Sequence, residues 1–200
     1  MKMSELEKKF VNSIKQAKKN IEIAERLFEQ TNLNNVSNVL EVGCGIGFLA
    51  SYLAKEYKWN VTGVDLDSEQ VKRAKIDNKE NDYLRFFEAD ATDLPFENNE
   101  FDVILSFDVL HHIPNWDKAL NEISRVLRLN GIYILNDLAL PRFTAKTFKG
   151  LLNNYMGVYS VDDIVNQLKR NNLDILYVER PTINILMKHF SLVSQICPTE

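Results

Sequence analysis

Three glycines at alternating positions form the segment of the chain that is best suited to hold a ligand. Gly43, Gly45 and Gly47 follow an apolar run that contains one carboxylate, Glu41. Glycine permits a tight turn from a strand into a helix and lets a ligand lie against bare backbone. Asp65 follows Gly43 by roughly 20 residues, the separation at which an acidic residue reaches a ribose in nucleotide-binding units. The pattern predicts a nucleoside ligand; the alternative for Asp65 is a helix-capping or solvent-facing carboxylate.

The spacing of these glycines distinguishes between two kinds of nucleoside ligand. Dinucleotide sites use the pattern G-x-G-x-x-G/A, but here the third glycine comes one residue early and Phe48 occupies the last position of that pattern. Glu41 would repel a pyrophosphate and attract a sulfonium or an amine. The spacing therefore disfavours an NAD(P)-dependent oxidoreductase and favours a positively charged ligand without phosphate.

Alternating strands and helices are expected to position this loop. The expected strands are 36–42, 60–65, 84–88, 101–107, 131–136, 174–179 and 183–188. The expected helices are 48–57, 68–81 with Ser68 as N-cap, 116–127, and one that begins at the capping-box pair of Ser160 and Asp163, while 141–157 is mixed and partly helical. This alternation predicts parallel strands with right-handed crossovers. The predicted fold is a Rossmann-like, doubly wound α/β domain, with a mostly parallel seven-stranded sheet, helices on both faces and an N-terminal helix.

The N-terminal helix is predicted from apolar residues that recur three or four positions apart, from Leu6 to Phe28. Its other face is rich in lysine, at Lys8, Lys9, Lys15, Lys18 and Lys19. The simplest interpretation is a solvated surface on which nearby glutamates, at Glu5, Glu7, Glu22 and Glu25, are partial partners. A helix that binds a partner is the alternative.

Five segments resemble motifs of the class I S-adenosylmethionine (SAM)-dependent methyltransferases, in their order and spacing. Residues 40–47 (LEVGCGIG) resemble the first motif, E/D-x-G-x-G-x-G, and 63–67 (GVDLD) resemble the second acidic site. Residues 87–96 and 101–113 resemble the third- and fourth-strand motifs, and 127–131 resembles the turn before the fifth strand, with Asn130 in place of the usual proline. The match covers about 36–137. By pattern, the nearest relatives are the small type 11 methyltransferases that resemble ubiquinone-biosynthesis enzymes.

The resemblance implies SAM as cofactor and S-adenosylhomocysteine as product. Glycines of the loop would lie under the methionine part of SAM, and Glu41 would help to hold its methionine end. Asp65 would accept hydrogen bonds from the ribose hydroxyls, Leu66 would pack on the adenine, and Asp90 would accept from the adenine amino group. The full predicted cofactor-binding set is Glu41, Gly43, Cys44, Gly45, Gly47, Asp65, Leu66, Asp90, Ala91 and Phe107.

The catalytic candidates follow the fourth and fifth strands. Methyl transfer from a sulfonium to an oxygen, nitrogen or carbon atom is an in-line displacement, in which the protein mainly aligns the reactants. A general base helps only if the acceptor must lose a proton. His112 and His111 could be that base, since histidine titrates near neutrality; the alternative is that they stabilise the loop. Asp137 could line the acceptor pocket.

The predicted organisation is one domain over 1–200, with an N-terminal helix and loop (1–34), a cofactor-binding part (35–137) and an acceptor-side part (138–200). Arg142, Tyr155 and Tyr159 are candidates for acceptor contacts, and surface or packing roles are their alternatives. A non-catalytic module that binds SAM or S-adenosylhomocysteine, or a partner subunit, remains the alternative function.

Composition narrows the partners. The net charge is −4, and a binder of nucleic acid usually has a basic surplus, so the expected acceptor is a small molecule and no nucleic acid. No apolar run approaches the ~20 residues of a membrane span, and no signal sequence is evident, so a cytoplasmic location is expected. Two cysteines do not make a disulfide framework or a zinc site, and no metal is expected. The oligomeric state stays open.

Overall fold

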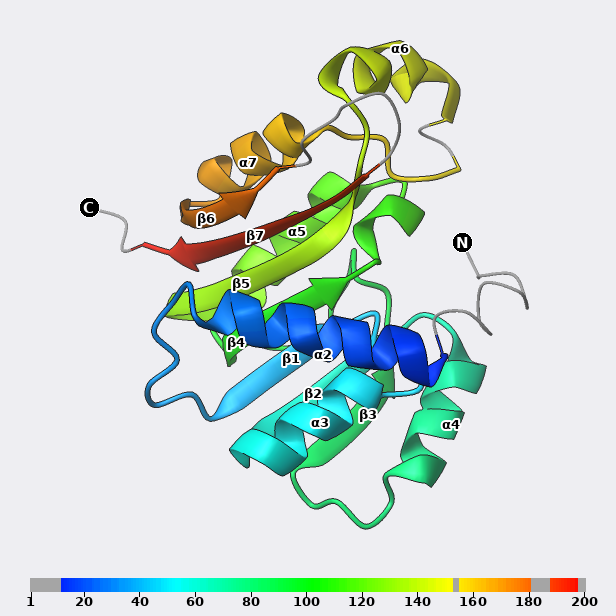
Figure 1. Cartoon of the computed structure of the whole chain (residues 1–200), viewed down its shortest axis with the longest axis vertical. Helices are drawn as coiled ribbons and strands as arrows, with labels where there is room; N and C mark the ends of the chain where they lie inside the picture. The colour runs from blue at the N-terminus through cyan, green and yellow to red at the C-terminus, as the bar shows by residue number, and fades with distance from the viewer. Residues whose placement is uncertain (1–11, 153–154, 181–187, 198–200) are drawn as a thin grey trace.

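The computed structural model describes residues 12–152, 155–180 and 188–197 (Figure 1). Its helices are α2 (Ile14–Phe28), α3 (Phe48–Tyr57), α4 (Ser68–Asp77), the 3₁₀ turn η1 (Leu110–His112), α5 (Trp116–Val126), α6 (Arg142–Leu152) and α7 (Val161–Arg170). Its strands are β1 (Asn38–Val42), β2 (Asn60–Asp65), β3 (Leu84–Glu88), β4 (Phe101–Phe107), β5 (Leu127–Ala139), β6 (Leu173–Glu179) and β7 (Lys188–Ile196). Leu6, Lys8 and the other residues of the predicted helix before residue 12 lie outside the described residues.

One seven-stranded sheet organises the chain, with the strand order β3-β2-β1-β4-β5-β7-β6. The first five of these strands are parallel to their neighbours, whereas β7 is antiparallel to both β5 and β6. The Rossmann-like, mostly parallel sheet predicted from the sequence is therefore confirmed. From β1 the chain continues to one side of the sheet and from β4 to the other, so the order reverses between these two strands, which is where ligands bind in such sheets.

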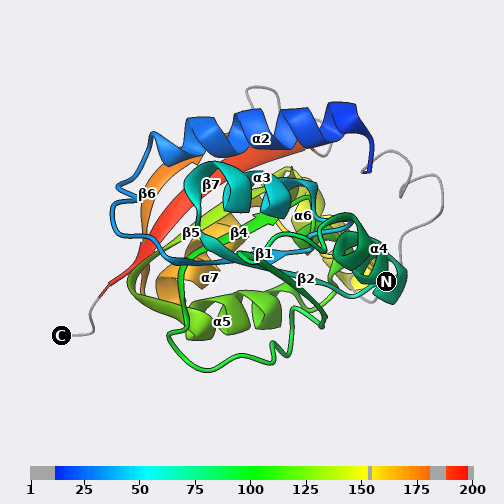
Figure 2. The ribbon, with the colours of Figure 1, turned by 90° about the horizontal axis from the view of Figure 1, so that it is seen from below.

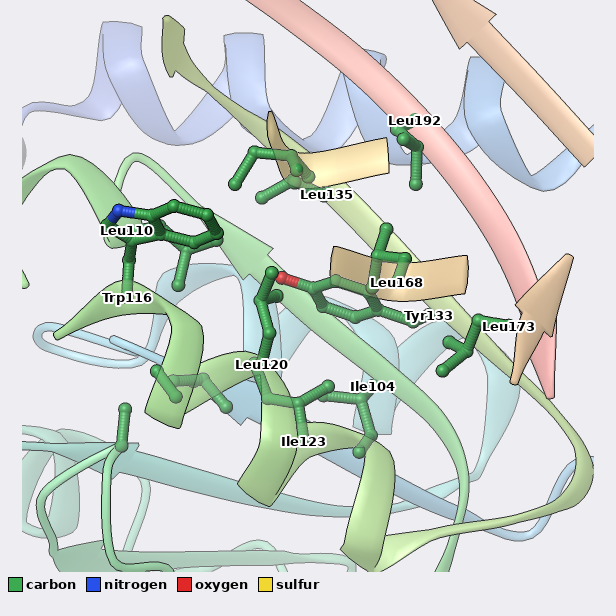
Figure 3. Packing of buried hydrophobic residues seen from close by; sticks show 14 of the residues in the cluster. Ile104, Leu110, Trp116, Leu120, Ile123, Tyr133, Leu135, Leu168, Leu173 and Leu192 are labelled. Carbon is green, nitrogen blue, oxygen red and sulfur yellow. The ribbon is translucent and has the colours of Figure 1, made fainter. Parts of the chain in front are cut away.

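Two apolar layers cover the two faces of the sheet. Along β4, Val103 and Leu105 pack with α2, α3 and α4, whereas Ile104 packs with α5 and α7. Helices α2 and α3 lie on one side of the sheet and α5 and α7 on the other (Figure 2). The second layer includes Leu120 of α5 and Leu168 of α7, which pack around β4 and β5 (Figure 3). Because both faces are covered, the central strands β1 and β4 are buried along nearly their whole length.

Several predicted boundaries are wrong. The first strand begins at Asn38 and not at residue 36, and the fifth begins at Leu127 and not at residue 131. Helix α4 is capped by Asp67, whose side chain accepts from the backbone of Glu69, so Ser68 is the first helical residue and not the cap. The helix ends at Asp77, four residues before the predicted end. The prediction also stopped the fifth strand at Asn136, but β5 continues to Ala139 because antiparallel pairing with β7 extends it.

The last strand of the structure, β7, was not predicted from the sequence beyond its first residue. Residues 183–187 lie outside the described residues, and β7 begins at Lys188, where the predicted strand ends. Residues 190–194 of β7 are all buried, and two of them are serines: Ser194 is fully buried, and Ser191 donates to the side chain of Asn136 on β5. A buried serine with a hydrogen-bond partner scores as polar in a sequence pattern, although it occupies a core position.

Candidate functional site

A cavity with about 1150 Å³ of open space, its mouth included, lies at the carboxyl ends of the parallel strands. Loops after β1, β2, β3 and β4 form most of the wall, and the first half of α2 closes one side. The cavity therefore occupies the point where the strand order reverses, as expected for a ligand site in this fold.

The glycine loop forms the floor of the cavity. The backbone N–H groups of Gly43 and Cys44 both donate to the carbonyl of Val64, at 2.8 and 2.9 Å, which folds the loop back onto β2. Gly43 and Gly45 have φ angles of +75° and +52°, a region in which residues with a Cβ are strained. A Cβ on Gly45 would meet nothing closer than the side chain of Asn12 at 3.4 Å, so this part of the floor is open to a ligand.

Asp65 holds the loop and lines the cavity at the same time. Its carboxylate accepts from the backbone of Gly45 and of Asp67, both at 2.9 Å. Burial raises the pKa of Asp65, although these two hydrogen bonds oppose the change. Its helix-capping alternative is excluded in this structure because Asp67 caps α4.

Glu41 is the second buried carboxylate of the floor. Its Oε2 accepts from the backbone of Ala50 in the first turn of α3, at 2.8 Å. Burial raises the pKa of Glu41, and the nearby Asp65 adds to this effect, whereas the hydrogen bond lowers the pKa. The net pKa is about 8. A cation in the cavity would stabilise the ionised forms of both carboxylates.

Most of the predicted site residues line this cavity. They are Glu41, Gly43, Cys44, Gly45, Asp65, Leu66, Asp90, Ala91 and Phe107 of the cofactor set, and His112 of the catalytic set. Gly47, His111 and Asp137 are not among the described residues that line it. Gly47 precedes α3 with a φ of +80°, and a Cβ there would lie 2.4 Å from the ring of Phe86, so close packing explains this glycine.

Asp137 is fully buried behind the cavity, where it organises the loop after β4. Its Oδ2 accepts from the backbone of Val109 and Leu110, and its Oδ1 accepts from the backbone of Leu138. Oδ1 also lies 2.5 Å from Nδ1 of His111. Burial alone would raise the pKa of Asp137, but these hydrogen bonds outweigh it and hold the pKa below its usual value. Asp137 and His111 thus fix the loop on which His112 reaches the cavity.

The sequence missed a polar cluster at the α2 side of the cavity. Asp108, with a φ of +58°, lines the cavity directly after β4, and its Oδ2 accepts from Nε2 of Gln16 at 3.3 Å. Nδ1 of His189 on β7 lies 3.3 Å from the other oxygen of Asp108. Burial raises the pKa of Asp108, and His189 opposes this change. Asn20 of α2 lines the cavity beside this cluster.

The three residues considered for acceptor contacts do not line the cavity. Tyr159 is buried and packs edge-on against Trp116, with ring centroids 5.3 Å apart, which is the packing role. Arg142 and Tyr155 are exposed. Among the described residues, the lining ends at Ile113, so the acceptor-side role of 138–200 stays a prediction.

Two structural features are absent from the described part of the chain. No helix there combines the length and the apolar character needed to cross a bilayer. No group of three or more His, Cys, Asp or Glu side chains is arranged to hold a metal ion.

The sequence matches the family model described as a methyltransferase domain over residues 40–135. It is 41% identical over 110 residues to a fatty-acid O-methyltransferase of Mycolicibacterium smegmatis, a match that covers 52% of this chain and 38% of that protein. Further matches bear N- and C-methyltransferase names. The chain spans less than half the length of the curated relatives it matches.

Solved structures share the fold at low identity. A putative sarcosine dimethylglycine methyltransferase from Galdieria sulphuraria superposes with a TM-score of 0.75 at 17% identity, over 90% of this chain and 86% of that one. The [4+2]-cyclase SpnF superposes with a TM-score of 0.74 at 18% identity, over 88% and 80%. Residues 40–135 therefore match the methyltransferase domain family in sequence, and the chain has the fold of class I methyltransferases.

Proposed function

We propose that the chain is a SAM-dependent methyltransferase that moves the methyl group of SAM to an oxygen, nitrogen or carbon atom of a small-molecule acceptor. The charge of the cavity carries this proposal. Among its described lining residues there is no lysine or arginine, whereas five carboxylates line it: Glu41, Asp65, Asp67, Asp90 and Asp108. Such a cavity favours a cation and disfavours phosphates. SAM has a sulfonium and an ammonium group and no phosphate.

The positions of the predicted cofactor residues fit this ligand. Gly43 and Gly45 supply bare floor for the methionine part, and Glu41 supplies a buried carboxylate beside it. Asp65 keeps lone pairs for ribose hydroxyls, because two backbone donors use only part of its accepting capacity. Leu66, at the rim, is 44% exposed and would pack on the adenine.

Alignment is the main catalytic task of these residues. When bound, SAM supplies a methyl group that is already activated by the sulfonium. The glycine loop and the carboxylates would fix the donor, and the α2 side of the cavity would hold the acceptor in line with it. Orientation of this kind supplies roughly 7–11 kcal/mol of a reaction barrier.

His112 is the residue we assign to proton removal, where the acceptor has a proton to lose. It lines the cavity, and its ring lies 4.0 Å from that of His111. His111 and Asp137, which were catalytic candidates in the sequence, become positioning residues because they hold the loop from behind.

The acceptor and the cellular setting extend the same proposal. A small-molecule acceptor fits the name of the fatty-acid O-methyltransferase relative. The net charge of −4 supports an acceptor other than nucleic acid and fits a cytoplasmic protein.

Calorimetry with S-adenosylhomocysteine and NAD tests the cofactor. We expect saturable binding of S-adenosylhomocysteine and weak or no binding of NAD, because the acidic cavity lacks cations for a pyrophosphate. Binding of NAD without binding of S-adenosylhomocysteine would refute the proposal. The matched control is Lys169→Glu, an exposed change on α7 that should leave both affinities unchanged.

A non-catalytic SAM-binding module is the second candidate. The likeness to the cyclase SpnF favours it, because this fold also occurs in a protein that is named for another reaction. Incubation with methyl-labelled SAM and a panel of small molecules distinguishes the two. Label in any acceptor, lost in His112→Ala or Gly45→Ala, supports methyl transfer; binding without transfer across the panel supports the module.

A further inference from the structure

Helix α6 exposes an aromatic side chain that its own packing does not explain. Phe143 is 84% exposed, and Arg142, Lys146 and Thr147 beside it are exposed as well. Of the helix residues whose side chains are described, only Ala145 is buried. The helix projects at one end of the molecule, away from the layers that cover the sheet (Figure 1). Its outer surface is therefore available to a partner.

The charge around this helix is opposite to that of the chain. Residues 138–161 contain Arg142, Lys146 and Lys149 and no aspartate or glutamate, although the chain as a whole has a net charge of −4. Exposed cations beside an exposed aromatic ring are typical of helices that lie on a bilayer surface with anionic lipids.

The first turns of α2 show the same combination. Ile14 is 69% exposed, Lys15 and Lys18 are exposed, and residues 12–21 contain no acidic residue. Glu25, a partner considered for these lysines, is used otherwise, because its carboxylate accepts from the hydroxyls of Tyr52 and Tyr57. Within the described residues, no ion pair is formed by Lys15 or Lys18.

Helix α2 borders the cavity, and the segment that contains α6 is joined to the loop of the site. The inner face of α2 contributes Ala17 and Asn20 to its wall. The two ends of the segment that contains α6 are held together by a hydrogen bond from the backbone N–H of Leu140 to the carbonyl of Tyr159. The segment also contacts the loop of the site, where the backbone N–H of Gly157 donates to the carbonyl of His111 at 3.0 Å. The α2 cluster thus lies on a helix of the cavity wall, and the α6 cluster lies on a segment that is joined to the loop carrying His112.

We propose that these two clusters, Arg142, Phe143 and Lys146 on α6 and Ile14, Lys15 and Lys18 on α2, dock the protein on a membrane surface that contains anionic phospholipid. Phe143 and Ile14 enter the interface, and the cations pair with lipid phosphates. The acceptor is then an apolar molecule that reaches the cavity from the bilayer, a step that rests on the proposed function. An aliphatic Ile14 favours lipid over nucleic acid, since it offers no ring on which a base could stack.

Vesicle sedimentation tests the docking with the full chain. Vesicles of phosphatidylcholine alone are compared with vesicles in which one third of the lipid is phosphatidylglycerol, over a salt series. We expect binding only with phosphatidylglycerol, weakening with salt. The double change Arg142→Glu with Lys146→Glu should weaken it by at least about tenfold, since each cation near an anionic surface contributes to binding. Phe143→Ser should weaken it about tenfold.

Matched controls separate docking from folding and from cofactor binding. Lys55→Glu with Lys169→Glu makes the same charge change on α3 and α7, and Leu129→Ser removes an apolar side chain that is also exposed; both should keep full vesicle binding. All variants should keep their affinity for S-adenosylhomocysteine, which tests the proposed function separately. Absent or lipid-independent binding, equal loss in the control variants, or salt-sensitive binding of RNA in place of vesicles overturns the docking.

Discussion

Two glycines of the same loop should respond to alanine in different ways. At Gly43 a Cβ would lie 2.1 Å from Cγ2 of Val109 and 3.0 Å from its Cγ1, and Val109 is held by a backbone bond to Asp137. Overpacking of this kind costs about 1–3 kcal/mol, and the left-handed backbone adds about 1–2 kcal/mol. Gly43→Ala should therefore lower the stability of the free protein by about 2–5 kcal/mol. For a chain of this size, the melting temperature should fall by about 4–20 °C.

At Gly45 the cost falls on the ligand. A Cβ there has no neighbour closer than Asn12 at 3.4 Å and Gln70 at 4.0 Å, both of which line the cavity. Gly45→Ala should thus lose only the backbone contribution of about 1–2 kcal/mol in stability. The new methyl group should nevertheless weaken the binding of S-adenosylhomocysteine by at least about tenfold, because it projects into the part of the cavity where we expect the ligand to lie.

A double-mutant cycle with Val109→Ala isolates the predicted clash. In the Gly43→Ala background, Val109→Ala removes both close methyl groups and should show a favourable coupling of about 1–3 kcal/mol in denaturant unfolding. In the Gly45→Ala background the coupling should be near zero, which serves as the control. A coupling near zero at Gly43 would show that the loop relaxes freely. An unchanged affinity in Gly45→Ala would show that the ligand does not lie on this loop.

Three further predictions concern the buried carboxylates. Asp65→Ala should weaken the binding of S-adenosylhomocysteine by at least about tenfold, as measured by calorimetry. It should also lower the melting temperature of the free protein, because the backbone N–H groups of Gly45 and Asp67 lose their acceptor. An unchanged affinity would show that the ribose lies elsewhere. The pKa of Glu41 is about 8, so this carboxyl is mostly neutral at pH 7, and a bound ammonium should lower its pKa and release a proton. Calorimetry in buffers of different ionisation enthalpy should detect this release in the wild type and not in Glu41→Gln. The free protein should lose stability as the pH rises through about 8, because the raised pKa of Glu41 means that the folded state favours its neutral form. The pKa of Asp137 is lowered, so its contribution to stability is present above about pH 4 and is lost as the pH falls; Asp137→Asn should cost about 3–5 kcal/mol at pH 7 and flatten this acid dependence, and an equally steep acid transition in the variant would contradict it.

The floor of the cavity could be predicted from the sequence because its determinants are local. A strand, a glycine turn and a helix follow one another in the chain, and Asp65 ends the next strand along, so spacing alone brings Gly45 and Asp65 together. The function of Gly47 could not be separated from that of Gly45 in the same way. Both are glycines in one pattern, but Gly47 packs against Phe86, which comes from a strand about forty residues later.

The α2 side of the site could not be predicted, because it depends on how distant elements pack. The periodicity of α2 identifies an apolar face, but it does not say that Gln16 on that helix meets Asp108 after β4. Only the antiparallel register of β7 against β5 places His189 beside Asp108. Sequence separation between these partners is large, and no short pattern records it.

The buried carboxylates also determine the electrostatics of the site. No lysine or arginine neutralises the carboxylates among the described lining residues, and burial raises the pKa of Glu41, Asp65 and Asp108. Backbone N–H groups, from Ala50 and Gly45 among others, supply part of the missing positive potential. Glu41 and Asp65 thus favour a cation without a basic side chain beside them that a ligand would have to displace, whereas Asp108 has His189 as a neighbour. A ligand's own positive charge would therefore neutralise the carboxylates of the cavity. A ligand with a phosphate would instead be repelled by these carboxylates, and burial strengthens that repulsion.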